Sequence, residues 1–205
     1  NVSTCAVEEI SLTAGSKETP VVATVAGLIG SLNQSTVSAC FSTGKIVVAD
    51  TSSKVAGFIG NMVVSSTVGS VQQSYANVES ENANYAGFIN TISTAGNMDN
   101  ANYLKFLVGN YSVASNGVAV KEKPDLIKKL YSEENLVYGV KNFASTDEMK
   151  SNCKFVFYAT NSQKVYWDKV VWKIVEANLP VLYSTNVAPS AVSSEYYLAD
   201  NDSKH

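Results

Sequence analysis

The acidic residues are the side chains in this sequence best suited to chemistry. Glu79 and Glu81 lie in the segment NVESENAN, Asp99 lies in GNMDNAN, and Asp50 precedes both segments. Hydrolysis of a sugar chain uses two carboxylates held about 5 to 10 Å apart, so these residues are the candidates for a polysaccharide-acting enzyme. Their Asn and Ser neighbours are typical of exposed loops. We therefore expect solvated loop carboxylates, with the enzyme as the alternative.

Other catalytic arrangements lack the residues that they need. The single histidine, His205, is the last residue of the sequence, which disfavours Ser-His-Asp and Cys-His arrangements and histidine-based metal sites. All 15 Lys and Arg positions are lysines, so the arginine fork that recognises phosphates is absent, and a polysaccharide lyase would need lysine as its base. The oxygens of NMDNAN (97–102) suit calcium, but their spacing matches no known calcium loop. We predict no catalytic, cofactor or metal site.

Aromatic side chains in the C-terminal third offer a second alternative, because such rings can stack on sugars. These residues are Tyr158, Tyr166, Trp167, Trp172, Tyr196 and Tyr197. Aromatic residues in a capping element more often belong to a core. We therefore expect core residues, with a carbohydrate-binding module as the alternative.

The composition is that of an ordinary soluble protein. With 205 residues, 45% apolar residues and a formal net charge of −3, the chain can form a packed core and carries no basic stripe for nucleic acid. The longest apolar run, VVATVAGLIG (21–30), is shorter than the roughly 18 to 20 residues of a membrane-spanning helix. No basic leader precedes the first unit, so we expect either that a leader has been removed or that this sequence is part of a longer one.

A repeat organises the first 118 residues. VAGLIG (25–30), VAGFIG (55–60) and YAGFIN (85–90) recur at intervals of thirty residues. The units are rich in strand-forming residues with alternating patterns, and a period of this length is typical of stacked coils. We predict a mainly β protein with a right-handed parallel β-solenoid over residues 1–118.

Columns of equivalent residues follow from this stacking. Leu28, Phe58 and Phe88 are expected to form one interior column, with Ile29, Ile59 and Ile89 beside it or facing away. Gly27, Gly57 and Gly87 are expected to allow a turn or a close backbone approach that a Cβ would obstruct.

A second motif places three small residues on neighbouring coils. VSTC, VSAC and VQQS stack Cys5, Cys40 and Ser74, at spacings of 35 and 34 residues. A Cys5–Cys40 disulfide and a column of small buried side chains both fit this placement, and the column is favoured because free cysteine packs as a small hydrophobe. Since the sequence opens in mid-unit at VSTC, we expect it to be cut from a longer array.

The repeats resemble the GLUG repeat of large bacterial surface and secreted proteins, which include adhesin-like chains and the immunoglobulin A1 peptidase group. The resemblance is carried by AGLIGSLNQSTVSACFSTGKI (26–46), by AGFIGNMVVSSTVGSVQQSYANVE (56–79) and by a degraded third copy (86–109). STDEMKSNCKF (145–155) and VYWDKVVWKIVEANLPVL (165–182) resemble the segment that often ends such arrays, although Asn178 and Leu179 stand where Gly or Gly-Tyr is common. The resemblance implies architecture and carries little information on activity.

Residues 119–205 are expected to form an α+β cap over the last coil, with two short helices and final strands. KPDLIKKLYSEEN (123–135) predicts one helix, and a capping box of Ser145 and Glu148 predicts a second that includes Met149. Trp172 and Leu182 are expected to be buried. Such a cap would blunt an open sheet end that otherwise promotes aggregation.

These observations favour a non-catalytic extracellular module. We expect a stiff structural or adhesive solenoid of a surface adhesin or fibre, with no membrane-spanning segment and no nucleic-acid partner. Its expected partners are further domains of a longer chain, neighbouring subunits and surface carbohydrate. Four Asn-x-Ser sequons suit secretion, and they begin at Asn1, Asn33, Asn110 and Asn201.

Overall fold

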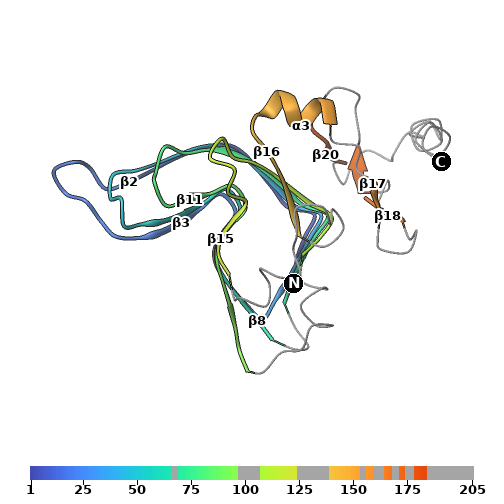
Figure 1. Cartoon of the computed structure of the whole chain (residues 1–205), viewed down its shortest axis with the longest axis horizontal. Helices are drawn as coiled ribbons and strands as arrows, with labels where there is room; N and C mark the ends of the chain where they lie inside the picture. Colours follow the sequence, from blue (N-terminus) through green and yellow to red (C-terminus); the bar gives the residue numbers. More distant parts are fainter. Residues whose placement is uncertain are drawn as a thin grey trace.

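The computed structural model shows a stack of parallel β-coils with a smaller C-terminal part beside it (Figure 1). The residues that it describes are 1–65, 69–96, 107–123, 139–152, 156–158, 164–167, 171–173 and 178–183. The solenoid makes about three turns and the chain is mainly β. This architecture confirms the predicted parallel β-solenoid.

Four parallel sheets run along the stack, and successive coils add one strand to each. Sheet A contains β1 (Val2–Ser3), β5 (Thr36–Ser38), β9 (Ser70–Gln72) and β13 (Leu107–Val108). Sheet B contains β2 (Ala6–Ala14), β6 (Phe41–Val48), β10 (Tyr75–Glu79), β14 (Asn110–Val113) and β16 (Val140–Phe143). Sheet C contains β3 (Thr24–Ala26), β7 (Lys54–Ala56) and β11 (Tyr85–Ala86). Sheet D contains β4 (Ile29–Asn33), β8 (Ile59–Val64), β12 (Ile89–Thr94) and β15 (Val120–Glu122).

The solenoid extends past the expected boundary at residue 118. β15 pairs in parallel with β12, and β16 pairs in parallel with β14, so both belong to the stack. The repeat motif fades before these strands, whereas the backbone pairing continues, because pairing needs extended backbone and not a particular sequence. The helix expected over 123–135 lies almost entirely outside the described residues.

Two interior clusters fill the coils. The first cluster is enclosed by sheets A and D and by the start of sheet B, and it contains Phe58, Met62 and Phe88. The second cluster lies between the end of sheet B and sheet C, and it contains Ile46, Val78 and Tyr85. The Phe58 and Phe88 rings stack with centroids 4.5 Å apart and planes 6° apart, and Leu28 packs against the same cluster. The predicted interior column is confirmed. Stacked aromatic pairs of this kind add about 0.5 to 1.5 kcal/mol to the effect of burial.

The glycine column is explained by close backbone contact between coils. A Cβ at Gly27 would overlap the carbonyl oxygen of Gly57, and a Cβ at Gly57 would overlap that of Gly87. The Gly57 amide also donates to the Ala86 carbonyl at 2.9 Å. Of the two reasons that the sequence suggested for these glycines, the structure supports the close approach.

The corners between sheets A and B have a left-handed residue in each coil. Thr4, Ala39 and Gln73 have φ of 52°, 52° and 49°, and Gly109 follows in the next coil with φ of 66°. The Ala39 amide donates to the Gln72 carbonyl at 3.0 Å, and the Gln73 amide donates to the Val108 carbonyl at 2.9 Å. Non-glycine residues in this region cost about 1 to 2 kcal/mol each, so these hydrogen bonds between coils help to hold the corner.

A polar column follows these corners. The Cys5 amide donates to Cys40 Sγ at 3.4 Å, the Cys40 amide to Ser74 Oγ at 3.1 Å, and the Ser74 amide to Asn110 Oδ1 at 3.1 Å. Cys5 and Cys40 are free thiols in this structure. The structure therefore agrees with the expected column of small side chains, and it shows in addition that each side chain accepts a hydrogen bond from the preceding coil.

The C-terminal part packs against the side of the solenoid. Phe41, Tyr75 and Tyr111 point outward from sheet B, and their rings form a cluster with Trp167 and Trp172. The Phe41 and Tyr75 rings stack with centroids 4.9 Å apart. Burial of Trp172 is confirmed, while Leu182 is partly buried against the same cluster.

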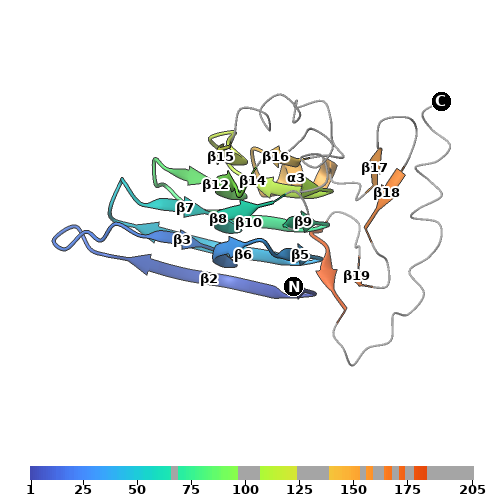
Figure 2. The same cartoon turned by 90° about the horizontal axis from the view of Figure 1, so that it is seen from below.

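The expected position over the last coil is therefore corrected only for the described residues between 156 and 183, since β15 and β16 extend the stack at its end. β17 (Val156–Tyr158) pairs antiparallel with β18 (Lys164–Tyr166), and β19 (Trp172–Lys173) pairs antiparallel with β20 (Val181–Leu182). Figure 2 shows β17, β18 and β19 beside the stack. They lie there because the outer aromatic column of sheet B would otherwise expose large apolar rings on three coils.

Helix α3 (Thr146–Asn152) begins at the predicted capping box. The Glu148 amide donates to Ser145 Oγ at 3.1 Å, and the Glu148 carboxylate accepts a hydrogen bond from the Ala144 amide at 2.7 Å. Met149 is fully buried in the outer aromatic cluster. The capping box thus anchors the helix start beside β16.

The glycine column yields a matched pair of substitutions. Gly57→Ala is expected to destabilise the chain by about 1 to 3 kcal/mol, because its Cβ overlaps backbone that cannot move without shifting a coil. Gly30→Ala is the control, since a Cβ there meets nothing within 4 Å, and it should be neutral or slightly stabilising. Urea unfolding of both variants measures the difference. Equal stability of the two variants would contradict the packing argument.

Candidate functional site

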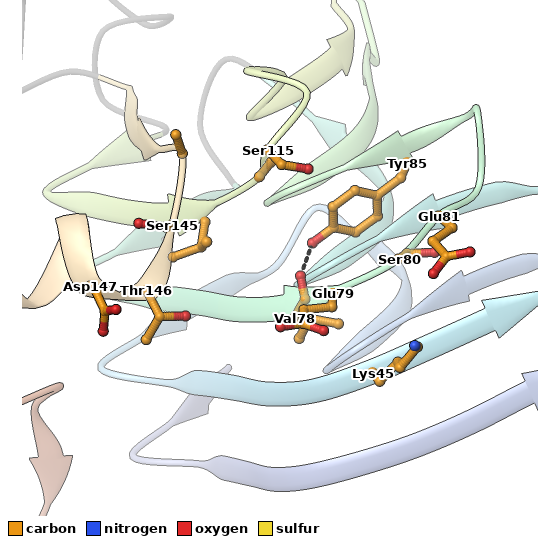
Figure 3. Close-up of a pocket in the computed structure, with 13 residues that line it drawn as sticks. Lys45, Val78, Glu79, Ser80, Glu81, Tyr85, Ser115, Ser145, Thr146 and Asp147 are labelled. Carbon is orange, nitrogen blue, oxygen red and sulfur yellow. Dashed lines mark hydrogen bonds between the residues drawn. The ribbon is translucent and has the colours of Figure 1, made fainter.

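A pocket of about 430 Å³ opens beside the end of sheet B. It lies where β6 and β10 meet the start of helix α3, and Figure 3 shows its side chains. Its lining residues are Lys45, Val78, Glu79, Ser80, Glu81, Tyr85, Val113, Ala114, Ser115, Ala144, Ser145, Thr146 and Asp147. Two of the carboxylates selected from the sequence, Glu79 and Glu81, therefore share one hollow.

The strand register places a cation beside a carboxylate at this pocket. Lys45 on β6 is the parallel partner of Glu79 on β10, and both side chains are exposed. Opposite charges on neighbouring strands contribute about 0.2 to 1 kcal/mol. The pair gives the floor of the pocket both an acceptor and a donor.

The turn after β10 positions the far wall. The Asn82 side chain donates to the Asp50 carbonyl at 2.9 Å, and the Asn84 side chain donates to the Thr51 carbonyl at 2.7 Å. These two amides attach the turn to the equivalent turn of the preceding coil. Glu81 projects from this turn, and Tyr85 follows it on β11.

Tyr85 forms a buried wall of the pocket. Its hydroxyl donates a hydrogen bond to the Val78 carbonyl, as the dashed line in Figure 3 marks. Burial raises the pKa of the Tyr85 phenol, and the neighbouring Glu79 carboxylate raises that pKa further. The phenol therefore stays protonated at neutral pH and acts as a structural donor.

The three carboxylates of the pocket are spread along it. In Figure 3, Asp147 from helix α3 lies at one end, Glu81 lies at the other, and Glu79 lies between them. Within the part of the chain that the structure describes, no group of three or more His, Cys, Asp or Glu side chains is placed to hold a metal ion. The arrangement suits reversible contact with a hydroxyl-rich or cationic ligand, because exposed carboxylates, hydroxyls and one amine surround the hollow.

The other selected carboxylates do not join this pocket. Asp50 Oδ1 accepts the Ser52 amide at 2.7 Å, so the carboxylate belongs to a turn. Asp99 and the rest of the NMDNAN segment lie outside the described residues, as do Cys153 and His205.

The aromatic residues selected from the sequence have different outcomes. Trp167 and Trp172 are 1% and 0% exposed and belong to the core, so neither ring is available to a sugar. Trp167 Nε1 also donates to the Gly109 carbonyl at 2.8 Å. Tyr158 and Tyr166 lie in β17 and β18, while Tyr196 and Tyr197 fall outside the described residues. The interpretation as core residues is thus confirmed for the two tryptophans.

The sequons also differ in their exposure. Asn1 and Asn33 are exposed. Asn110 is 1% exposed, and its amide nitrogen donates to the Val71 carbonyl at 2.8 Å. Asn110 is therefore a structural member of the polar column, and glycan attachment would require that its coil open. Asn201 lies outside the described residues.

Among the pocket residues with ionisable side chains, the sequence did not single out Lys45, Tyr85 and Asp147. Lys45 precedes Glu79 by 34 residues, the same spacing that separates Cys40 from Ser74, so the repeat offset could have identified the pair. No sequence signal brings Asp147 to these strands, because its position depends on the packing of helix α3 against the stack.

Comparison with known proteins identifies no relative. No family model matches the chain, and no curated protein or solved structure matches it. Among the described residues, no helix is long and apolar enough to cross a membrane.

Replacement of Tyr85 tests the buried wall of the pocket. Tyr85→Phe should destabilise the chain at pH 8 by about 1 to 2 kcal/mol, because the Val78 carbonyl loses its buried donor. The phenol ionises in the unfolded chain above pH about 10 but resists ionisation when folded, so wild-type stability falls as pH rises through this range. Urea unfolding should show a smaller difference between the two proteins at pH 11 than at pH 8. A constant or growing difference would contradict the raised pKa.

Proposed function

We propose that this chain is a non-catalytic structural and adhesive module of the GLUG-repeat type, acting as a stiff β-solenoid at a cell surface or after secretion. The observation that carries the proposal is the unbroken stacking of equivalent residues across coils. The column Val2, Val37, Val71 and Leu107 pairs strand by strand along sheet A. A chain built this way gains length with each coil.

Rigidity is supported by hydrogen bonds that run along the stack. Besides the four sheets, the polar column links coils through the side chains of Cys40, Ser74 and Asn110. Each coil is thus held to the next at strands and at corners. A rod of this kind is suited to holding partner domains apart, or to presenting loops to neighbouring subunits and to surface carbohydrate.

The adhesive part of the proposal rests on the loops and the pocket. The turns differ in length between coils while the strands stay in parallel pairing, so recognition can vary without change to the pairing. The pocket between Glu79 and Asp147 offers exposed carboxylates and hydroxyls to a ligand. Exposed Asn1 and Asn33 are compatible with glycosylation in a secreted protein, provided that the source organism glycosylates such sites.

A polysaccharide-acting enzyme is the second candidate, and the shared pocket of Glu79 and Glu81 favours it. In this candidate the two carboxylates would divide the roles of acid and base. The exposure of both Glu79 and Glu81 argues for the non-catalytic proposal, because a catalytic carboxylic acid is commonly held in a water-poor pocket.

An activity screen separates these two candidates. Uronate-containing and neutral polysaccharides, with and without calcium, are incubated with the wild type and with Glu79→Gln, Glu81→Gln and Asp50→Asn variants. We expect no new reducing ends or unsaturated products above the blank for any protein, because Glu79 and Glu81 are both exposed to solvent. The matched control is Asp50→Asn, which removes a turn carboxylate outside the pocket. Turnover that survives in this control and disappears in Glu79→Gln would overturn the proposal in favour of the enzyme.

Surface labelling tests the location. An antibody against the folded chain, applied to intact cells of the source organism and to their medium, is expected to detect it at the surface or outside the cell. Protease treatment of intact cells should then remove the surface signal. Detection only after cell lysis would contradict an extracellular role.

A further inference from the structure

The first two coils place two thiols at equivalent positions of the stack. The pairs Ser3 with Ser38 and Ala6 with Phe41 bracket Cys5 and Cys40 on both sides of the corner. Equivalent positions on neighbouring strands lie about 4.8 Å apart, which falls within the Cα separation of about 4.4 to 6.8 Å that a disulfide requires. The backbone geometry of this corner therefore suits a bond between the coils.

A direct contact joins the two residues across the coils. The Cys5 amide donates to Cys40 Sγ at 3.4 Å. Burial raises the pKa of the Cys40 thiol to about 11. Each thiol also donates to a carbonyl two residues earlier, Cys5 to Ser3 at 3.4 Å and Cys40 to Ser38 at 3.2 Å. Oxidation removes these two weak donor contacts, and the Cys40 sulfur that accepts the Cys5 amide becomes part of the bond.

We propose that Cys5 and Cys40 form a disulfide that joins the first coil to the second when a disulfide oxidant such as oxidised glutathione is present. The site is a covalent modification site within the solenoid. It does not depend on the surface role proposed above, because it follows from the geometry of two adjacent coils.

The reaction is a thiol–disulfide exchange in two steps. Cys5 is half-buried whereas Cys40 is 0% exposed, so the oxidant reaches Cys5 first. The Cys5 thiolate attacks one sulfur of oxidised glutathione, a mixed disulfide forms, and one glutathione thiolate leaves. Cys40 then loses its proton to solvent and attacks the Cys5 sulfur, and the second glutathione thiolate leaves. Two protein thiols are oxidised and one glutathione disulfide is reduced to two thiols.

The bond would join the first coil of this sequence to the second, and strands β1 and β2 of that first coil flank Cys5. A bond from Cys5 to Cys40 closes a loop that contains most of this coil, and such a loop restricts the unfolded chain.

The experiment uses the full chain with Cys153→Ser, which leaves Cys5 and Cys40 as the only thiols. The protein is equilibrated in a glutathione buffer, first reducing and then oxidising, and is digested without reduction. We expect a linked peptide pair that has lost the mass of two hydrogen atoms, and the number of titratable thiols should fall from two to none. The thermal midpoint of the oxidised protein should exceed that of the reduced protein by about 5 to 10 °C.

Cys40→Ser in the same Cys153→Ser background is the matched control. Serine occupies the equivalent position of the next coil at Ser74, where it accepts the Cys40 amide and donates to the Gln72 carbonyl at 2.8 Å. The control should therefore fold normally, keep one titratable thiol in reducing buffer, and show no rise in thermal midpoint on oxidation.

Specificity is measured by repeating the equilibration in urea. The folded chain should form the link at a glutathione ratio about ten times more reducing than the unfolded chain, because folding holds the two sulfurs together. Three results would overturn the proposal: two free thiols in oxidising buffer, a mixed disulfide on Cys5 as the only product, or a link that forms no more readily when the chain is folded.

Discussion

Parallel pairing between coils is the interaction on which the rest of this structure depends. Once Ile29 pairs with Ile59 and Ile59 with Ile89, the neighbouring residues of these strands are assigned to columns. The register shifts between Val7 and Ile10, where β2 pairs with β6. The columns then determine which side chains face the interior, and the apolar ones stack there as Phe58 and Phe88 do. Glycines where coils come closest let the backbones meet without a Cβ between them. A shift of one residue would reverse the faces of every strand, so burial and pairing support each other.

The polar column shows how chemically different residues satisfy one local requirement. At each corner a left-handed residue turns the chain, and the following amide points along the stack toward the next coil. Cysteine, serine and asparagine each place an acceptor where this amide needs one. Serine and cysteine additionally donate to the carbonyl two residues earlier. Substitution among these types is therefore tolerated at the corner, while an apolar residue would leave a buried amide without an acceptor.

The sequence alone was sufficient to predict the solenoid, because a repeat shows directly which residues occupy equivalent positions. Three copies of an AGFIG-like motif establish a period, and the period predicts columns. The C-terminal part has no repeat, so its packing could be predicted only by knowing which face of sheet B is outward. Alternation alone could not decide this question, because Phe41 and Tyr75 are large and apolar while the inward Ser42 and Ala76 are small. Only part of the pocket could be predicted from the sequence. Glu79 lies in the repeat, whereas Asp147 lies outside it.

The outer aromatic cluster links the C-terminal part to several coils at once, which has a mechanical consequence. Trp172 contacts the rings of Phe41 and Tyr75, and Trp167 contacts those of Tyr75 and Tyr111, so this layer spans three successive strands of sheet B. The Tyr75 hydroxyl donates to the Pro180 carbonyl at 2.9 Å, and Thr146 Oγ1 lies 2.7 Å from Asn77 Oδ1. Separation of one coil from the next along this side would therefore also expose the buried aromatic rings of the layer to water. Because burial of one such ring contributes about 1.5 to 3 kcal/mol, the layer resists separation of coils at the flank, where the pocket also lies.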